Sequence, residues 1–278
     1  MSLTDQRVTE LETLCRRFRI DVIRTLYKRQ TGHPGGSLSV CEILAVLYLQ
    51  RMRVSAADPK AEDRDRLILS KGHAAPMLYR VLAEKGFLPL EELDTLRELD
   101  TRLQGHPCAL HTPGVDATSG PLGLGLSVGI GMALGARLKE SPFRTYVVLG
   151  DGEAEEGIVW EACMAAAKYR LDNLCAVLDW NRVQLDGTTD QIMPEGDLEE
   201  KFRAFGWHTI PCDGHDVRQL DGAFDEAERV KGRPSVILAH TIKGKGVSFM
   251  EGEHGWHGRA VDAESFQRAM EELGGMES

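Results

Sequence analysis

Apolar residues recur along the chain with two different spacings. Between residues 11 and 26, and again between 40 and 52, they return every three or four positions, which predicts two amphipathic helices, with Ser39 as the N-cap of the second. After residue 65, short continuous apolar runs alternate with further helical patterns. The apolar runs predict strands at 66–70, 145–149, 174–179, 207–211 and 235–240. The helical patterns lie at 77–84, 122–138, 156–169, 197–204, 216–231 and 263–273.

Strands that are apolar on both faces and separated by helices are typical of βαβ units. The pattern therefore predicts an α/β fold with a doubly wound, mostly parallel sheet and helices on both faces. The chain has 278 residues, 42% hydrophobic and 27% charged, and no linker-like tract divides it. We expect one domain over residues 1–278, with an N-terminal helical segment at 1–60 and a C-terminal tail at 259–278.

Charge, targeting signals and cysteines exclude several classes of protein. The N-terminus has no basic region followed by an apolar core, and no apolar run approaches the roughly 18 residues of a membrane span. We therefore expect a cytoplasmic protein without a membrane partner. A formal charge of -10 argues against general binding to nucleic acid. The six cysteines are scattered without a CxxC pair, so we expect reduced, mostly buried thiols, and we interpret Asp213-Gly-His-Asp216 as a turn despite the CxxH spacing of Cys212 and His215.

A glycine-rich acidic stretch, Gly150 to Gly157, directly follows one predicted strand, and Asn181 follows the next strand along the chain. Parallel strands end at the same edge of a sheet, where ligands bind, so Asp151 and Asn181 should meet although 30 residues separate them. Their oxygens suit Mg²⁺ or Ca²⁺. Gly150 and Gly152 allow close approach of a phosphate, and a helix starting near Glu156 would point free N–H groups at it. Without Asn181, Gly-Asp-Gly would be interpreted as an ordinary turn.

Several motifs together resemble the N-terminal, diphosphate-binding domain of transketolase. Gly-Asp-Gly followed about 30 residues later by Asn is similar to the thiamine diphosphate motif. The other motifs occur in order along nearly the whole chain. They are GHPGG at 32–36, SKGHA at 70–74, GHP at 105–107, SGPLG at 119–123, DGHD at 213–216, KGKG at 243–246 and WHG at 256–258.

The resemblance implies a set of cofactor and metal ligands. Asp151, Asn181 and the backbone carbonyl of Val183 are expected to bind the divalent metal, Mg²⁺ by preference, with Ca²⁺ or Mn²⁺ as substitutes. The residues expected to bind or border thiamine diphosphate are His73, Gly120, Leu122, Gly150, Asp151, Gly152, Glu156, Asn181 and His257. Glu156 is also expected to join a carboxylate network across a subunit interface.

The resemblance further implies that His33, His73, His106 and His257 line the channel to the reactive carbon of the cofactor. Ketose cleavage requires removal of a hydroxyl proton, and addition to an aldehyde requires its return. Imidazole, with an ordinary pKa of about 6.5, can do both near neutral pH. An isolated histidine is more often structural, but the first three of these each lie beside glycine in a separate turn, which favours exposure to a common pocket.

Two positions depart from the family pattern. Trp180 replaces the acidic residue that often precedes the asparagine, and Lys71 stands where several relatives carry asparagine. The metal ligands are unaffected, but both departures bear on the polarity of the pocket and on the choice of substrate.

The expected activity is transfer of a two-carbon ketol unit from a ketose to an aldose, with sugars or sugar phosphates as substrates. The alternatives are another thiamine diphosphate reaction, of the 2-oxo acid decarboxylation or 1-deoxyxylulose phosphate synthesis type, and a non-catalytic relative. In full-length transketolases a second domain holds the aminopyrimidine ring. The expected partner is therefore a separately encoded C-terminal subunit, in an α₂β₂ assembly with a homodimer through residues 122–138 at its centre. The competing interpretation is a fragment of a longer protein.

Overall fold

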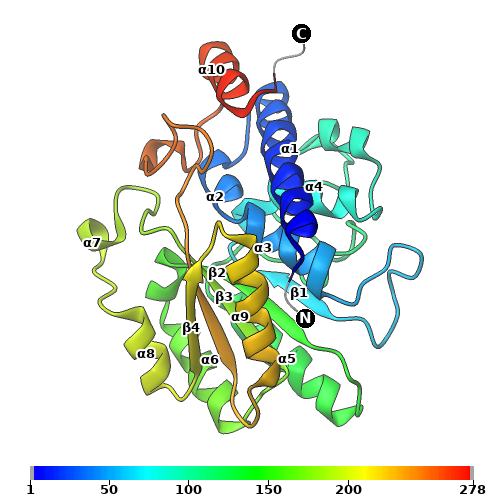
Figure 1. Cartoon of the computed structure of the whole chain (residues 1–278), viewed down its shortest axis with the longest axis vertical. Helices are drawn as coiled ribbons and strands as arrows, with labels where there is room; N and C mark the ends of the chain where they lie inside the picture. The colour runs from blue at the N-terminus through cyan, green and yellow to red at the C-terminus, as the bar shows by residue number, and fades with distance from the viewer. Residues whose placement is uncertain (1–2, 276–278) are drawn as a thin grey trace.

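A parallel sheet forms the centre of the structure, a computed structural model that describes residues 3–275. The hydrogen-bonded strand order is β1-β2-β3-β5-β4, and each neighbouring pair is parallel (Figure 1). The strands are β1 (Arg66–Leu69), β2 (Thr145–Gly150), β3 (Leu174–Trp180), β4 (His208–Asp213) and β5 (Ser235–His240). The ends of the predicted segments 1–60 and 259–278, residues 1–2 and 276–278, lie outside the described residues.

Helices cover both faces of the sheet, which confirms the predicted fold class. They are α1 (Asp5–Arg29), α2 (Pro34–Ser39), α3 (Cys41–Val46), α4 (Ala75–Glu84), α5 (Leu124–Leu138), α6 (Gly157–Lys168), α7 (Thr189–Ile192), α8 (Leu198–Ala204), α9 (Val217–Arg229) and α10 (Ala263–Leu273). Residues of α1, α3, α4 and α9 share one apolar cluster with Tyr146 and Val148, whereas residues of α5, α6 and α8 share another with Val147 and Leu149. Because successive side chains of a strand point to opposite faces, β2 contributes to both layers.

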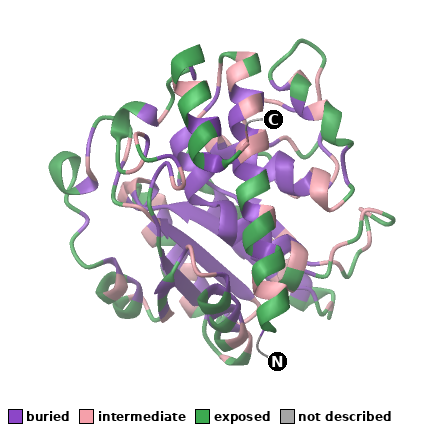
Figure 2. Ribbon diagram, turned by 45° about the horizontal axis from the view of Figure 1, so that its top comes forward, coloured by how far each residue is buried: buried purple, intermediate pink, exposed green. Residues whose placement is uncertain are grey.

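The three inner strands carry almost only buried residues (Figure 2). This burial explains their mostly apolar runs, since a strand covered on both faces favours apolar side chains on both. At the outer edge, β4 alternates buried and more exposed positions instead. Among the described helices none combines the length and the apolar character needed to cross a bilayer.

The predicted cap at Ser39 is wrong. Ser39 is the last residue of α2, a helix that begins with Pro34 and that the sequence pattern did not predict. Its hydroxyl is buried and donates to the carboxylate of Asp179, and Val40 precedes α3 without a side-chain cap. Pro34 favours this helix because its fixed backbone angle and missing N–H suit a first helical position.

Candidate active site

A cavity of about 170 Å³ lies beyond the carboxyl ends of the inner strands. The loops after β1, β2, β3 and β5 contribute to its wall, together with α2. Its lining residues are Gly36, Lys71, His73, Leu122, Gly150, Asp151, Gly152, Glu153, Asn181, Val183, Gln184, Leu185, Lys243 and His257. Eight of the twelve predicted site residues are among them. The other four, His33, His106, Gly120 and Glu156, lie outside this lining.

The Gly-Asp-Gly turn places a buried carboxylate at the cavity wall. Gly150 ends β2 and pairs in register with Asp179 of β3, which brings the two following loops together. Asp151 is 3% exposed, and among residues 3–275 its oxygens accept hydrogen bonds only from the backbone N–H groups of Gly152 and Arg182. Burial, and then the nearby Asp179, raise the pKa of Asp151 to about 6. A cation bound here would offset the cost of that buried charge.

Asn181 and Val183 line the same cavity. The Asn181 side-chain oxygen accepts from the Val183 N–H at 3.1 Å, and its amide nitrogen lies 3.4 Å from the Asp179 carboxylate. One carboxylate, one amide oxygen and one backbone carbonyl form the hard donor set that Mg²⁺ accepts, with positions left for phosphate oxygens. The residues present therefore fit a metal bound together with a diphosphate.

Two buried lysines, Lys71 and Lys243, also line the cavity. Sequence reasoning linked Lys71 to the polarity of the pocket but gave Lys243 no role. Lys71 forms a buried ion pair with Asp179. Lys243 donates to the Val183 carbonyl at 2.8 Å and to His257 Nδ1 at 2.9 Å, while burial and the charge of Lys71 lower its pKa to about 8. Lys243 stands in the KGKG motif shortly after β5, which was the available signal. The positive charges of these two lysines suit a cavity that binds a negatively charged diphosphate.

Glu153, also missed, ties three loops together beneath the cavity. One oxygen of its carboxylate accepts from the Gly123 N–H at 2.7 Å and from the Ser70 hydroxyl, and the other accepts from the Gly150 N–H at 3.0 Å. Burial raises the pKa of Glu153. Its position two residues after Asp151 gave no sign of this role, because the 3₁₀ turn Gly152–Glu155 turns it inward.

Three of the predicted histidines form a cluster at the cavity. The ring centroid of His73 lies 5.4 Å from that of His33 and 4.9 Å from that of His257, and the ring centroids of His33 and His257 are 5.5 Å apart. Burial, assisted by Arg97 and Lys243 respectively, lowers the pKa of His33 to about 4 and that of His257 to about 3. The pKa of His73 is lowered by burial as well. All three rings are thus neutral at pH 7.

His106 lies beside this cluster, over two glycines. A Cβ added at Gly72 would come within 3.2 Å of its ring, and one at Gly120 within 3.8 Å. Burial and the charge of Arg97 lower the pKa of His106. At Gly72 a side chain would press on the His106 ring, whereas at Gly120 a Cβ would make only ordinary contact with it.

The helix expected near Glu156 is present but contributes no residue to the wall of the cavity. Helix α6 begins at Gly157, Glu156 is its exposed N-cap residue, and no residue of α6 lines the cavity. The 3₁₀ turn Gly152–Glu155 separates the helix from the Gly-Asp-Gly turn. Glu156 packs against Gly123 instead.

The two departures from the family pattern have different consequences. Trp180 stacks on His240, with ring centroids 4.8 Å apart, and the Arg182 guanidinium lies over its ring. It does not line the cavity, so its bulk leaves the metal ligands in place. Lys71 does line the cavity, and its buried ion pair with Asp179 determines the charge of this part of the wall.

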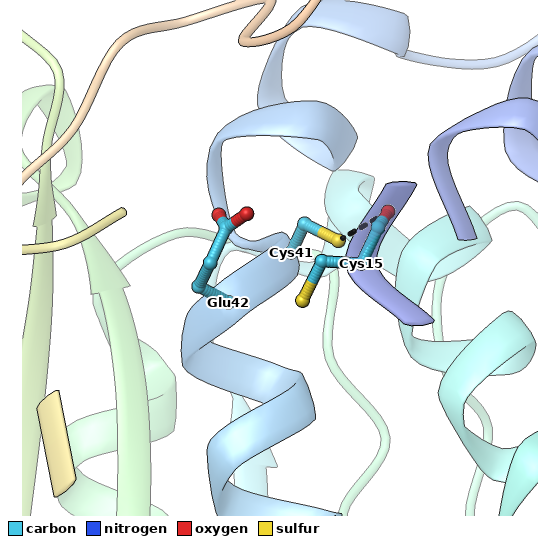
Figure 3. A group of neighbouring side chains, drawn as sticks. All are labelled: Cys15, Cys41 and Glu42. Atoms are coloured by element: carbon cyan, nitrogen blue, oxygen red, sulfur yellow. Dashed lines mark hydrogen bonds between the residues drawn. The ribbon is translucent and has the colours of Figure 1, made fainter. Parts of the chain in front are cut away.

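A second group of potential metal ligands, Cys15, Cys41 and Glu42, lies between α1 and α3 (Figure 3), and none of the three lines the cavity. Both oxygens of Glu42 are already engaged, by Arg19 at 2.6 and 2.8 Å and by His215 Nδ1 at 2.9 Å. Burial opposes ionisation of Glu42, but Arg19 outweighs it and lowers the pKa of Glu42 to about 2. These contacts make the group a structural network.

The same network explains the Asp213-Gly-His-Asp216 turn. His215 Nε2 accepts from the N–H of Ile242, the residue before Lys243, so the ring links α3 to the turn that carries this lysine. Both ring nitrogens are therefore occupied, which supports the interpretation as a turn. The cysteines are unpaired as expected, and five of the six are buried.

Comparison with known proteins gives a consistent result. Residues 11–278 match the family model described as transketolase, thiamine diphosphate binding domain. The chain is 47% identical over 246 residues to the 6-deoxy-6-sulfo-D-fructose transketolase subunit SqwG of Clostridium sp. (strain MSTE9), covering 88% of this chain and 90% of that protein. It is 40% identical over 267 residues to an apulose-4-phosphate transketolase subunit of Phocaeicola vulgatus, covering 96% of this chain and 95% of that protein.

Longer relatives match over only part of their length. Mouse transketolase is 41% identical over 272 residues, which are 96% of this chain but 42% of the mouse protein. Among solved structures, transketolase of Pichia stipitis in complex with sedoheptulose 7-phosphate superposes with a TM-score of 0.87 at 31% identity, over 95% of this chain and 40% of that one. The chain thus spans less than half of these relatives.

Proposed function

The chain belongs to the transketolase family through its thiamine diphosphate-binding domain, and we propose that it transfers a two-carbon ketol unit from a ketose to an aldose as one subunit of a two-subunit transketolase. The observation that carries this proposal is one cavity that joins the oxygens of Asp151, Asn181 and Val183 to two histidines, His73 and His257, with His33 packed against them. Oxygen ligands suit a metal–diphosphate unit, and neutral imidazoles suit proton transfer from sugar hydroxyls.

Asp151, Asn181 and the Val183 carbonyl would hold Mg²⁺, and Lys71 and Lys243 would face the diphosphate. Lys243 donates to the Val183 carbonyl in this structure, so its ammonium must move from that oxygen when the metal binds. When bound, thiamine diphosphate supplies the thiazolium ring that stabilises the carbanion formed on ketose cleavage. The protein's own contribution is position, charge and proton transfer.

The histidines would act as proton carriers and hydrogen-bond partners of the substrate. His33 Nδ1 is buried without a hydrogen-bond partner, and a substrate hydroxyl would satisfy it. The lowered pKa values of His33 and His106 keep both rings unprotonated at neutral pH, so each can accept a proton from a donor hydroxyl. His257 receives a hydrogen bond from Lys243 at Nδ1 and keeps its proton on Nε2.

A separate C-terminal subunit would supply the second half of the site. The two relatives that match this chain over 90% and 95% of their own length are both named as subunits. Mouse transketolase, of which the chain covers 42%, carries more than this domain in one chain. We propose that the partner subunit holds the aminopyrimidine ring of the cofactor, in an assembly of two copies of each subunit.

Helix α5 would join two copies of this chain. One face of the helix packs so closely on the sheet that a Cβ at Gly125 would lie 2.3 Å from Ser70 and one at Gly129 would lie 2.4 Å from Val147. The glycines of the opposite face, Gly131 and Gly135, have open space around them. Leu124, Val128 and Leu138 are exposed large apolar residues of the same helix. An apolar surface of this kind is typical of a protein interface.

Ketol transfer by the purified chain with thiamine diphosphate and Mg²⁺, measured with and without the C-terminal subunit, tests the proposal. We expect transfer from a ketose phosphate to an aldose only when both subunits are present. Substantial transfer by this chain alone would contradict the shared site. Pyruvate serves as the control donor, because decarboxylation without ketol transfer would identify a different thiamine diphosphate reaction.

A further inference from the structure

Arg182 has a backbone conformation that residues with a side chain rarely adopt. Its φ is 62°, in the left-handed region. Among residues 3–275, six residues other than glycine have a positive φ, and of these only Arg182 lies between two residues that line the cavity, Asn181 and Val183. Such a conformation costs free energy and persists where the surrounding contacts hold it, often at functional sites.

The backbone of Arg182 links the three expected metal ligands. Its N–H donates to the Asp151 carboxylate, and the Asn181 side-chain oxygen accepts from the Val183 N–H at 3.1 Å, across residue 182. The Arg182 carbonyl accepts from the Thr189 N–H at 3.0 Å, which closes the turn that follows. A change of φ at residue 182 would rotate Val183 relative to the peptide group that binds Asp151. The geometry of the donor set therefore depends on this one strained residue.

The side chain of Arg182 lies on a stack of two rings at the end of the sheet. Its guanidinium carbon is 5.2 Å from the centroid of the Trp180 ring. Trp180 and His240 are register partners in β3 and β5, and their rings stack with centroids 4.8 Å apart and an angle of 26° between the ring planes. Trp180 is half-buried, whereas Arg182 and His240 are exposed. A cation over an aromatic face is attracted by the π electrons, and indole is the strongest aromatic partner.

We propose that Trp180 and Arg182 are positioning residues of the metal–diphosphate site, an inference that rests on the proposed function. Neither side chain lines the cavity, so both act through the backbone of residue 182. The contact between the guanidinium and the indole ring offsets the cost of the left-handed backbone. It keeps Asp151 and Val183 in their relative places before the cofactor binds, and a larger fraction of molecules is then ready to bind it. The tryptophan that departs from the family pattern thereby has a role.

Substitution by glycine tests whether the stack acts by offsetting backbone strain, because glycine adopts a positive φ freely whereas alanine keeps the strain and loses the cation. Binding of Mg²⁺ in the presence of thiamine diphosphate is measured by calorimetry on the two-subunit enzyme. Arg182→Ala and Trp180→Leu should each weaken binding about two- to fivefold, the strength of an exposed cation–π contact. Arg182→Lys keeps a cation and should lie in between. Arg182→Gly should bind as tightly as the wild type, and adding Trp180→Leu to Arg182→Gly should change nothing further.

Hydrogen exchange of the cofactor-free chain gives a second measurement that needs neither metal nor turnover. The backbone amides of Arg182 and Thr189 should exchange about two- to fivefold faster in Arg182→Ala and in Trp180→Leu, because the turn opens more often. Arg170→Ala is the matched control, since Arg170 is an exposed arginine with a φ of 51° that does not line the cavity. It should change neither binding nor the exchange of these two amides.

Equal affinities of Arg182→Ala and Arg182→Gly would overturn the proposal, and so would an effect of Trp180→Leu that persists when it is combined with Arg182→Gly. Unchanged exchange of both amides in Arg182→Ala would overturn it as well. The proposed function fails separately, if the wild-type enzyme binds thiamine diphosphate and Mg²⁺ but transfers no ketol unit. In that case the order of affinities among the variants would still support the role of the stack.

Discussion

The chemistry of the site depends on a few buried charges that the fold alone does not neutralise. Asp151 has only backbone donors around its carboxylate, and burial raises its pKa to about 6. Its folded pKa lies above the ordinary value of 3.8, so the cofactor-free chain loses stability as pH rises between these two values. At pH 7 that cost is fully present, and a bound cation would remove it.

Replacing Asp151 by alanine should weaken binding of Mg²⁺ and thiamine diphosphate by more than about a hundredfold, since even residues behind a metal ligand contribute 10- to 100-fold. The free energy of unfolding of the cofactor-free chain at pH 7 should not fall, because an uncompensated buried charge is lost. Calorimetric titration and thermal unfolding measure the two effects. Asp190→Ala, an exposed carboxylate of α7, serves as the control. Unchanged cofactor binding in Asp151→Ala would refute the metal assignment.

The histidines should separate into two groups by their effect on binding and on turnover. In His106→Ala, turnover on a ketose donor should fall about 10²- to 10⁴-fold, the usual contribution of a positioned acid or base, while cofactor affinity changes little. In His257→Ala both quantities should fall, because the ring contacts Lys243 at the cavity wall. Steady-state rates are measured beside cofactor titrations, with the exposed His111→Ala as control. Equal losses of affinity and rate in His106→Ala would remove the distinction.

The sequence motifs predicted many of the side chains that meet at the candidate active site, but not all of those side chains. Asp151, Asn181 and the histidines could be placed because each directly follows a strand or stands in a glycine turn, and parallel strands end at one edge. Glu153 and Lys243 could not be assigned in this way. Their roles depend on the 3₁₀ turn after Asp151 and on the distance between the loops after β3 and β5, which are properties of the tertiary structure.

At the scale of elements, strands and most helices followed from their apolar periods, and β5 begins and ends where the pattern predicted. The missed helix α2 and the wrong cap at Ser39 have a common cause. Helix α2 consists of Pro34, two glycines, two serines and one leucine, a composition with low intrinsic helix propensity. It is helical because all six residues are buried. Tertiary packing therefore overrides propensity there, and Ser39 becomes part of the core.

Helix α5 gives a prediction for assembly. In Val128→Arg, a charge enters the centre of its exposed apolar face, and the dissociation constant for self-association should rise at least about tenfold, because an unpaired charge would be buried at the interface. Sedimentation of the purified chain measures this. Gln267→Arg, on the exposed face of α10, adds the same charge elsewhere and should leave the association unchanged. An unaltered sedimentation profile of Val128→Arg would place the interface on another surface.

At the scale of the whole molecule, the cavity draws its wall from distant parts of the sequence, from Gly36 to His257. These segments are brought together only when the strands β1, β2, β3 and β5 are aligned. A ligand seated there can thus bind no early folding intermediate, and it leaves the rate of folding unchanged. It stabilises only the finished state and slows its unfolding. The supply of the cofactor would then determine the lifetime of each folded molecule in the cell. The number of molecules produced would depend on synthesis alone.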